Sequence, residues 1–284
     1  MTGTFNFGGR GVHRIGFGAM QLPGPGVFGP PRDRSEALAV IRRAAELGVD
    51  HIDTAQYYGP DVANELLREA LHPFPDQLAL VSKVGAQRDN QGGWLPAGRP
   101  EQLRAGVLDN LRSLGVEQLH AVNLRLLDTG HGEPGAAFDE QLDAMIAVRD
   151  EGLIGGIGLS NVTLDQLAHA RTRTEIVCVQ NAYNLADRSA EPLLRACAAV
   201  GIAFVPFFPL GSAFGPSSAV LGHAGVLATA ARLEATPAQI ALAWVLAMAP
   251  NTLLIPGTAS LTHLEENLAA GSVVLDEEAL AVLS

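Results

Sequence analysis

Short apolar runs recur along the chain, and each is followed by a stretch in which apolar residues have the spacing of a helix. The runs are continuously apolar rather than alternating, which is typical of strands buried on both faces of a sheet. The connections between them are long enough for the crossovers that parallel strands require. Eight segments qualify as strands: 15–20, 51–55, 78–84, 120–126, 154–160, 176–181, 202–208 and 252–256.

Helices are predicted after these strands, the first of them with Ser35 in position to cap it. The candidates are 35–47, 62–71, 101–114, 138–151, 163–171, 190–200, 223–234, 237–248 and 261–269. Eight strand–helix units in 284 residues favour an α/β fold of the (β/α)8 TIM-barrel type, as a single domain over residues 1–284. An open, doubly wound sheet is the alternative. The segments 5–10 and 12–15 predict a short N-terminal hairpin.

The charge of the chain limits its partners. The formal net charge is −11 and no cluster of lysines and arginines stands out, so we expect no nucleic-acid partner. The chain has neither a signal-peptide pattern nor an apolar run long enough to span a bilayer, so we expect a soluble, cytoplasmic protein without a membrane partner. Cys178 and Cys197 match no metal or redox spacing, and the histidines form no ligand-spaced pair. We therefore expect reduced thiols and no metal.

Polar residues that can act in catalysis follow three neighbouring strands. Asp53 and Tyr58 come after the second strand, and Lys83 and Arg125 come at the ends of the third and fourth. The active site of such a barrel lies at the carboxyl ends of its strands, so these four side chains should meet. Two nearby cations would lower the pKa of Tyr58 below its ordinary value of about 10 and make it a proton donor near neutrality. A simpler interpretation is that Asp53 caps a helix and the cations lie on the surface.

A series of motifs resembles the aldo-keto reductase superfamily, in the order and at the spacing of that family, from about residue 14 to residue 270. The motifs are Asp53-Thr54-Ala55-x-x-Tyr58-Gly59, Val81-Ser82-Lys83, Gly158-Leu159-Ser160-Asn161, Val179-Gln180-Asn181 and Ile255-Pro256-Gly257-Thr258. The resemblance implies a barrel that binds NADPH without a Rossmann domain. In keeping with it, neither Gly16-x-Gly18 nor Gly156-x-Gly158 continues to a third glycine.

The resemblance also implies roles for the catalytic residues. Tyr58 would protonate the carbonyl oxygen as hydride arrives. Lys83, paired with Asp53, would lower the pKa of Tyr58 and help to stabilise the developing alkoxide. Arg125 stands where the family usually has a histidine, and a guanidinium stays charged over the whole working range of pH.

The cofactor site implied by the resemblance draws on the ends of several strands. Ser160, Asn161 and Gln180 would bind the nicotinamide amide, and Phe207 would stack on the ring where the family usually has a tyrosine. The full set is Gly18, Ala19, Met20, Ser160, Asn161, Gln180, Phe207, Leu210, Gly211, Ser212, Gly257, Thr258, His263, Glu266 and Asn267. The basic residues that often bind the 2′-phosphate are missing from the loop 257–263, so use of NADH stays open.

A narrower resemblance is to the bacterial pyridoxal reductase branch of the family, with which Arg125 and Phe207 agree. It rests on Trp94-Leu95-Pro96-Ala97, Val122-Asn123-Leu124-Arg125 and Val205-Pro206-Phe207-Phe208-Pro209-Leu210-Gly211, among others. It implies that pyridoxal is reduced to pyridoxine. Candidate substrate residues are Phe28, Trp94 and Phe208 as apolar walls and Asn123 as a donor. Alternatively, Phe28 and Trp94 pack only against their own loops.

Three other functions remain open at this point. Lys83 could form a Schiff base, as in a class I aldolase, although a neighbouring Asp53 would keep it protonated. The chain could instead be a redox-sensing binding protein, or a reductase of broad aldehyde and ketone specificity. The sequence leaves the oligomeric state undetermined.

Overall fold

Seven parallel strands form one curved sheet in a computed structural model that describes residues 3–127, 136–211 and 218–283. The order across the sheet is β11-β10-β9-β8-β5-β4-β3. The strands are β3 (Phe17–Gly18), β4 (His51–Asp53), β5 (Ala79–Val84), β8 (Leu119–Arg125), β9 (Ile154–Ser160), β10 (Cys178–Gln180) and β11 (Ala203–Phe204). Each pairs in parallel with its neighbour, as the crossover connections require.

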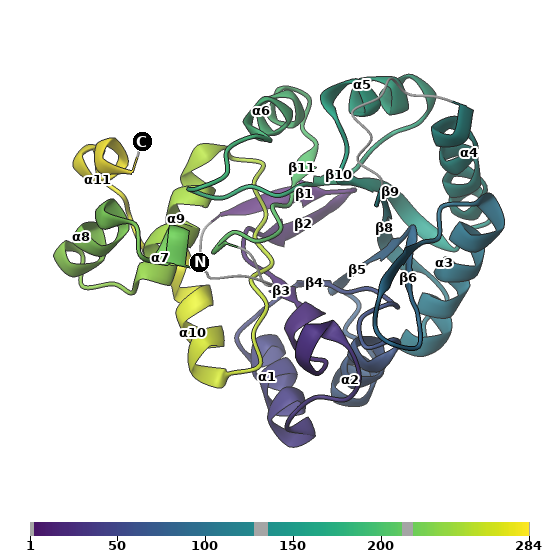
Figure 1. Ribbon diagram of the computed structural model, residues 1–284, viewed down its shortest axis with the longest axis horizontal. Helices are drawn as coiled ribbons and strands as arrows, with labels where there is room; N and C mark the ends of the chain where they lie inside the picture. Colours follow the sequence, from purple (N-terminus) through teal and green to yellow (C-terminus); the bar gives the residue numbers. More distant parts are fainter. Residues whose placement is uncertain (1–2, 128–135, 212–217, 284) are drawn as a thin grey trace.

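The eighth predicted strand closes the sheet into a barrel. Parallel bridges join Thr252 to Phe204 on one side and Leu254 to Ile15 on the other. The backbone N–H of Leu253 donates to the carbonyl of Phe204 at 2.9 Å, and that of Gly16 donates to the carbonyl of Leu254 at 2.8 Å. Both edges of the sheet are therefore paired, which confirms the barrel over the open sheet (Figure 1). Most strands are shorter than the apolar runs that predicted them.

Helices surround the barrel in the order that the sequence predicts (Figure 1). They are α1 (Arg34–Glu46), α2 (Val62–Leu71), α3 (Pro100–Leu114), α4 (Ala136–Asp150), α5 (Leu164–Arg173), α6 (Glu191–Ala199), α8 (Ala224–Arg232), α9 (Pro237–Met248) and α10 (Leu261–Ala269). The first is capped by Asp33 rather than by Ser35, because the Asp33 carboxylate accepts from the N–H of Glu36. Two short helices were not predicted: α7 (Ser218–Leu221) and α11 (Glu277–Val282). Within the described residues, no helix is long and apolar enough to cross a membrane.

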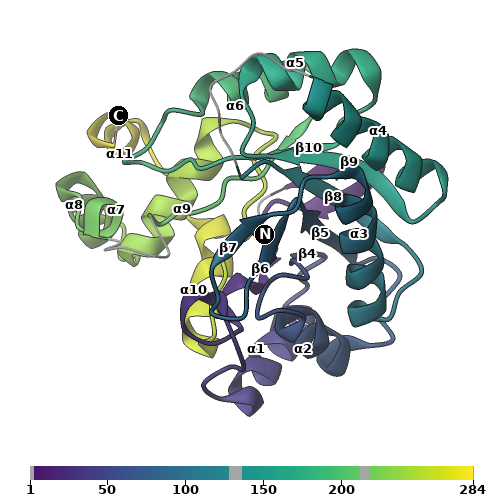
Figure 2. The ribbon, with the colours of Figure 1, turned by 45° about the vertical axis from the view of Figure 1, so that its right-hand side comes forward.

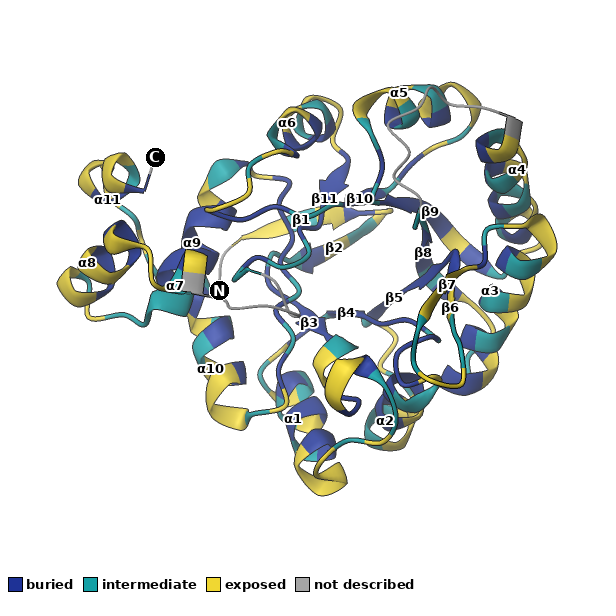
Figure 3. Cartoon of the chain, in the orientation of Figure 1, coloured by how far each residue is buried: buried dark blue, intermediate teal, exposed yellow. Residues whose placement is uncertain are grey.

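The predicted N-terminal hairpin is present and covers the amino ends of the strands. It consists of β1 (Thr4–Phe7) and β2 (Arg10–His13), and its Phe7 and Val12 are buried. The Phe7 carbonyl lies 2.8 Å from a ring nitrogen of His120, near the start of β8. Inside the barrel the hairpin packs against Ala79, Val81, Ala121, Cys178, Ala203, Val205 and Leu253. In Figure 3 the strands of the parallel sheet are mostly dark blue, the colour of buried residues.

A second hairpin, which the sequence did not predict, follows β5 at the opposite end of the barrel (Figure 2). It consists of β6 (Ala86–Arg88) and β7 (Trp94–Pro96). The chain turns into it at Gly85, whose φ of +103° places it in a region that favours glycine. A Cβ at Gly85 would also lie 2.2 Å from the carbonyl oxygen of Arg125. The hairpin therefore rises directly beside the carboxyl ends of β5 and β8.

Candidate active site

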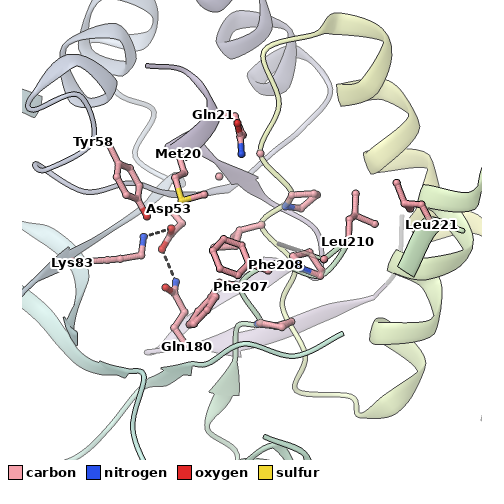
Figure 4. A pocket seen from close by; sticks show the side chains of 17 residues that line it. Met20, Gln21, Asp53, Tyr58, Lys83, Gln180, Phe207, Phe208, Leu210 and Leu221 are labelled. Carbon is pink, nitrogen blue, oxygen red and sulfur yellow. Dashed lines mark hydrogen bonds and ion pairs between the residues drawn. The ribbon is translucent and has the colours of Figure 1, made fainter. Parts of the chain in front are cut away.

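A buried ion pair joins the ends of β4 and β5. The Lys83 ammonium donates to Oδ1 of Asp53 and to the carbonyl of Thr54, the latter at 3.0 Å. Each charged side chain is only 5% exposed. Nε2 of Gln180, at the end of β10, donates to Oδ2 of Asp53 at 2.6 Å (Figure 4). Three strands thus contribute to one chain of charge-assisted hydrogen bonds, in which the Asp53 carboxylate holds both partners.

A buried polar network behind this pair fixes the backbone that carries it. The Thr54 hydroxyl donates to Asn64 at 2.7 Å, and Asn64 in turn donates to Asn110 at 3.0 Å. The Ser82 hydroxyl also donates to Asn110, at 2.5 Å. The network therefore ties the residues next to Asp53 and Lys83 to α2 and α3. Sequence reasoning missed Asn64 and Asn110, although an Asn in the middle of a predicted apolar helix is a signal for such a role.

Tyr58 lies beside the ion pair and is 5% exposed. Its ring centroid is 5.0 Å from the Lys83 ammonium nitrogen. Burial raises the pKa of the Tyr58 hydroxyl above its ordinary value; the Asp53 charge raises it further, and the Arg125 charge lowers it. The prediction of a lowered pKa was wrong for this protein, because burial of the hydroxyl and the nearby Asp53 charge together outweigh the effect of the Arg125 charge. Tyr58 therefore keeps its proton through the neutral range of pH and has it available to donate.

Arg125 joins the group from the end of β8. Its NH1 donates to the hydroxyl of Ser160, at the end of β9, at 3.0 Å. The guanidinium carbon lies 5.1 Å from the centroid of the Phe207 ring. These two contacts hold the guanidinium in the wall of the cavity that Tyr58 and Lys83 also line. The structure thus brings together all four predicted catalytic side chains.

Two adjoining cavities meet at this group. The larger, of about 290 Å³, contains seven of the predicted cofactor residues: Gly18, Met20, Gln180, Phe207, Leu210, Gly211 and Gly257. It is also lined by residues that sequence reasoning missed: Gln21, Pro206, Pro209, Leu221, Ile255 and Pro256. Figure 4 shows it running from Tyr58 and Lys83, past Phe207, to Leu210 and Leu221. Such a long, mainly apolar trough suits an extended cofactor.

The other predicted cofactor residues do not line this cavity. Ala19 and Ser160 are fully buried, and the Asn161 amide donates to the carbonyl of Leu126 at 2.7 Å. The remaining four lie in or just before α10, after the closing strand: Thr258, His263, Glu266 and Asn267. Ser212 lies outside the described residues.

The smaller cavity, of about 220 Å³, shares Met20, Tyr58, Lys83, Gln180, Phe207 and Phe208 with the larger one. Four further side chains line it: Tyr57, Trp94, Arg125 and Leu127. Two predicted substrate residues, Trp94 and Phe208, are therefore in place. Sequence reasoning missed Tyr57 and Leu127, which no motif distinguishes from core residues.

The other two predicted substrate residues do not line either of these cavities. Asn123 is fully buried in the barrel, where Oδ1 of its side-chain amide accepts from the thiol of Cys178 at 3.2 Å. It stands two residues before Arg125 on β8, one layer deeper in the barrel. The centroid of the Phe28 ring lies 5.5 Å from the guanidinium carbon of Arg88, so Phe28 packs against the β6–β7 hairpin and not only against its own loop.

The comparisons with known proteins agree with this geometry. The model of the aldo/keto reductase family matches residues 14–284. Pyridoxine 4-dehydrogenase of Escherichia coli strain K12 is 50% identical over 281 residues, which cover 99% of this chain and 96% of that protein. The crystal structure of an aldo-keto reductase from Klebsiella pneumoniae in complex with NADPH is 27% identical. Its TM-score is 0.82, with 100% of this chain and 94% of that chain covered.

Proposed function

The chain belongs to the aldo/keto reductase family, and we propose that it reduces the aldehyde of pyridoxal to an alcohol with NADPH. The observation that carries the proposal is the position of Tyr58. It stands where the two cavities meet, next to the Asp53–Lys83 pair, so that a proton donor borders both. This arrangement separates a site for a long cofactor from a site for a small carbonyl compound.

The larger cavity fits the nicotinamide end of NADPH. Oε1 of Gln180 is buried and has no hydrogen-bond partner within the described part of the chain, so it can accept from an amide N–H. Phe207 provides an aromatic face beside it. A Cβ at Gly18 would lie 2.4 Å from the carbonyl oxygen of Ile255, so a glycine is needed to keep that wall close. When bound, NADPH supplies the hydride for the reduction.

The side chains of the site complete the reaction by moving one proton and stabilising one charge. The Tyr58 hydroxyl donates its proton to the carbonyl oxygen as that oxygen becomes an alkoxide. The Lys83 ammonium and the Arg125 guanidinium stabilise the negative charge in a site largely shielded from water. Asp53 holds Lys83 in place, and Gln180 holds Asp53 in place; neither Asp53 nor Gln180 reacts. The contacts of the Lys83 side-chain nitrogen with Asp53 and with the carbonyl of Thr54 also argue against a Schiff base, because they engage the atom that would have to attack the carbonyl carbon.

Pyridoxal is proposed as the substrate on two grounds. The relative that is 50% identical is a pyridoxine 4-dehydrogenase. The smaller cavity offers aromatic walls, Trp94 and Phe208, together with the cationic Arg125, which suits a flat aromatic aldehyde that bears oxygen substituents.

The test is the rate of NADPH oxidation with pyridoxal, compared with a panel of simple aldehydes and ketones and with NADH. We expect the highest kcat/KM for pyridoxal with NADPH. Faster turnover of unrelated carbonyl compounds would mean that the protein is a reductase of broad specificity and that pyridoxal is not its preferred substrate. Tight binding of NADPH without turnover of any carbonyl compound would favour a redox-sensing protein instead.

The cation at position 125 leads to a prediction about pH. We expect kcat/KM for reduction to be flat between about pH 5 and 8, because Tyr58 stays protonated and a guanidinium stays charged. In Arg125→His, activity should fall as the pH rises through about 6.5, because only the imidazolium form carries the charge. Arg125→Lys should keep the flat profile, since it keeps the charge. Identical profiles for the wild type and the histidine variant would contradict this account.

A further inference from the structure

The hydroxyl of Tyr57 is buried beside the catalytic group and has no use in the chemistry described above. The side chain is 2% exposed, and its hydroxyl has no hydrogen-bond partner among the residues that the structure describes. Buried hydroxyls are nearly always paired, since an unpaired one destabilises the fold. A hydroxyl left in this state at a site of catalysis suggests that a ligand completes its hydrogen bonding.

Aromatic contacts on two sides fix the ring of Tyr57. It packs edge-to-face on Tyr58, with ring centroids 5.4 Å apart, and on Trp94, with centroids 5.5 Å apart. Trp94 is held in turn by the Arg88 guanidinium, whose central carbon lies 4.0 Å from the indole centroid. The NH2 of Arg88 also donates to the carbonyl of Gly26 at 2.8 Å, which ties the hairpin β6–β7 to the loop before α1. The Tyr57 hydroxyl therefore has a fixed direction.

That hydroxyl lies in the electrostatic field of the catalytic residues. Burial raises the pKa of Tyr57, the Tyr58 and Asp53 charges raise it as well, and those of Lys83 and Arg125 lower it. Tyr57 therefore stays protonated, and it can donate a hydrogen bond to an acceptor. The Tyr57 side chain lines the smaller cavity together with Tyr58, Trp94 and Arg125, so a substrate bound in that cavity would lie next to it.

We propose that the Tyr57 hydroxyl donates a hydrogen bond to an oxygen that the substrate carries next to its carbonyl group, and so selects ortho-hydroxylated aromatic aldehydes. This inference rests on the proposed function and adds a specificity-determining residue to it. The hydroxyl is shielded from solvent and has no partner within the described residues, so a substrate oxygen would be the acceptor that it lacks. An aldehyde without the neighbouring oxygen leaves the hydroxyl unpaired and gains nothing from it.

The experiment compares Tyr57→Phe with the wild type on a matched pair of aldehydes, 2-hydroxybenzaldehyde and benzaldehyde. We expect kcat/KM for 2-hydroxybenzaldehyde to fall about 10-fold in the variant, mainly through KM, and kcat/KM for benzaldehyde to change less than about 2-fold. The thermal midpoint should stay equal or rise, because the change removes an unpaired buried polar group. A fall of equal size for both aldehydes would overturn the inference and leave Tyr57 as a packing residue.

Failure of the proposed function can be told apart from failure of this inference. If the wild type reduces neither these two aldehydes nor pyridoxal, the proposed function fails, and binding of the two corresponding benzyl alcohols to the NADP⁺-loaded enzyme is measured by calorimetry instead. Tighter binding of 2-hydroxybenzyl alcohol, lost in Tyr57→Phe, supports the inference independently of turnover. Equal affinities for the two alcohols in the wild type would refute it.

Discussion

Replacement of Tyr58 by phenylalanine is expected to lower kcat for aldehyde reduction by about 10²–10⁴-fold, the usual effect of losing a general acid. The ring that borders both cavities remains, and only the proton donor is lost. The Lys83 ammonium keeps its hydrogen bonds to Asp53 and to the carbonyl of Thr54, so the ion pair beside the missing hydroxyl is unchanged. Single-turnover rates with saturating NADPH measure the effect on the chemical step directly.

The chain's third tyrosine provides a matched control for this change. Tyr183 is fully buried, its ring stacks on Trp244 with centroids 5.8 Å apart, and it lines neither of the two cavities. Tyr183→Phe should therefore keep kcat within about 2-fold of the wild type, and both variants should bind NADPH with unchanged affinity. Retention of more than a tenth of the wild-type kcat in Tyr58→Phe would mean that another group donates the proton.

Replacement of Lys83 by methionine is expected to impair both stability and activity. The change leaves the Asp53 carboxylate buried without its cation, and breaking a buried pair in this way destabilises a protein by about 3–5 kcal/mol. Activity should fall because neither the developing alkoxide nor Asp53 then has the ammonium beside it. Denaturant unfolding gives the change in free energy of unfolding, and steady-state kinetics gives the change in kcat.

The double variant Asp53→Asn/Lys83→Met separates the two effects. Both charges are removed, and the asparagine carbonyl can still accept from Gln180, so much of the lost stability should return. Catalysis should not return, since the ammonium is still absent. Additive losses of stability in the double variant would show that the two side chains do not interact as a pair.

The barrel was predictable because its signals are local. Each strand is a short apolar run, and each helix follows as a segment in which apolar residues have helical spacing, so the order of elements follows from the chain alone. The hairpin β6–β7 was not predictable from apolar pattern, since residues 86–96 are mostly polar or small. It forms because Gly85 turns the chain and because Asp89 accepts hydrogen bonds from the N–H groups of Gln91 and Gly93.

The positions of the candidate site residues at the strand ends could be predicted from the sequence. Properties that depend on burial, such as a pKa or the depth of a side chain in the barrel, could not. Asp53, Lys83 and Arg125 meet because parallel strands end at the same rim. Asn123 was misplaced although it lies on the same face of β8 as Arg125. Side chains two positions apart on a strand share a face, but each such step moves one layer along the barrel, so Asn123 lies deeper than Arg125. The direction of the Tyr58 pKa shift depends mainly on how far the hydroxyl is buried, which cannot be read from the sequence.

The central claim is that one pocket carries out a direct reduction of the carbonyl carbon, with Tyr58 as the proton donor. NADPH deuterated on one or the other face of its nicotinamide C4, reacted with pyridoxal and analysed by mass spectrometry, tests this most directly. The account predicts one deuterium in the new CH–OH group from only one of the two labelled cofactors, because a fixed wall of Phe207 and Gln180 orients the ring. An alcohol product without label from either cofactor, or with label from both, would contradict it.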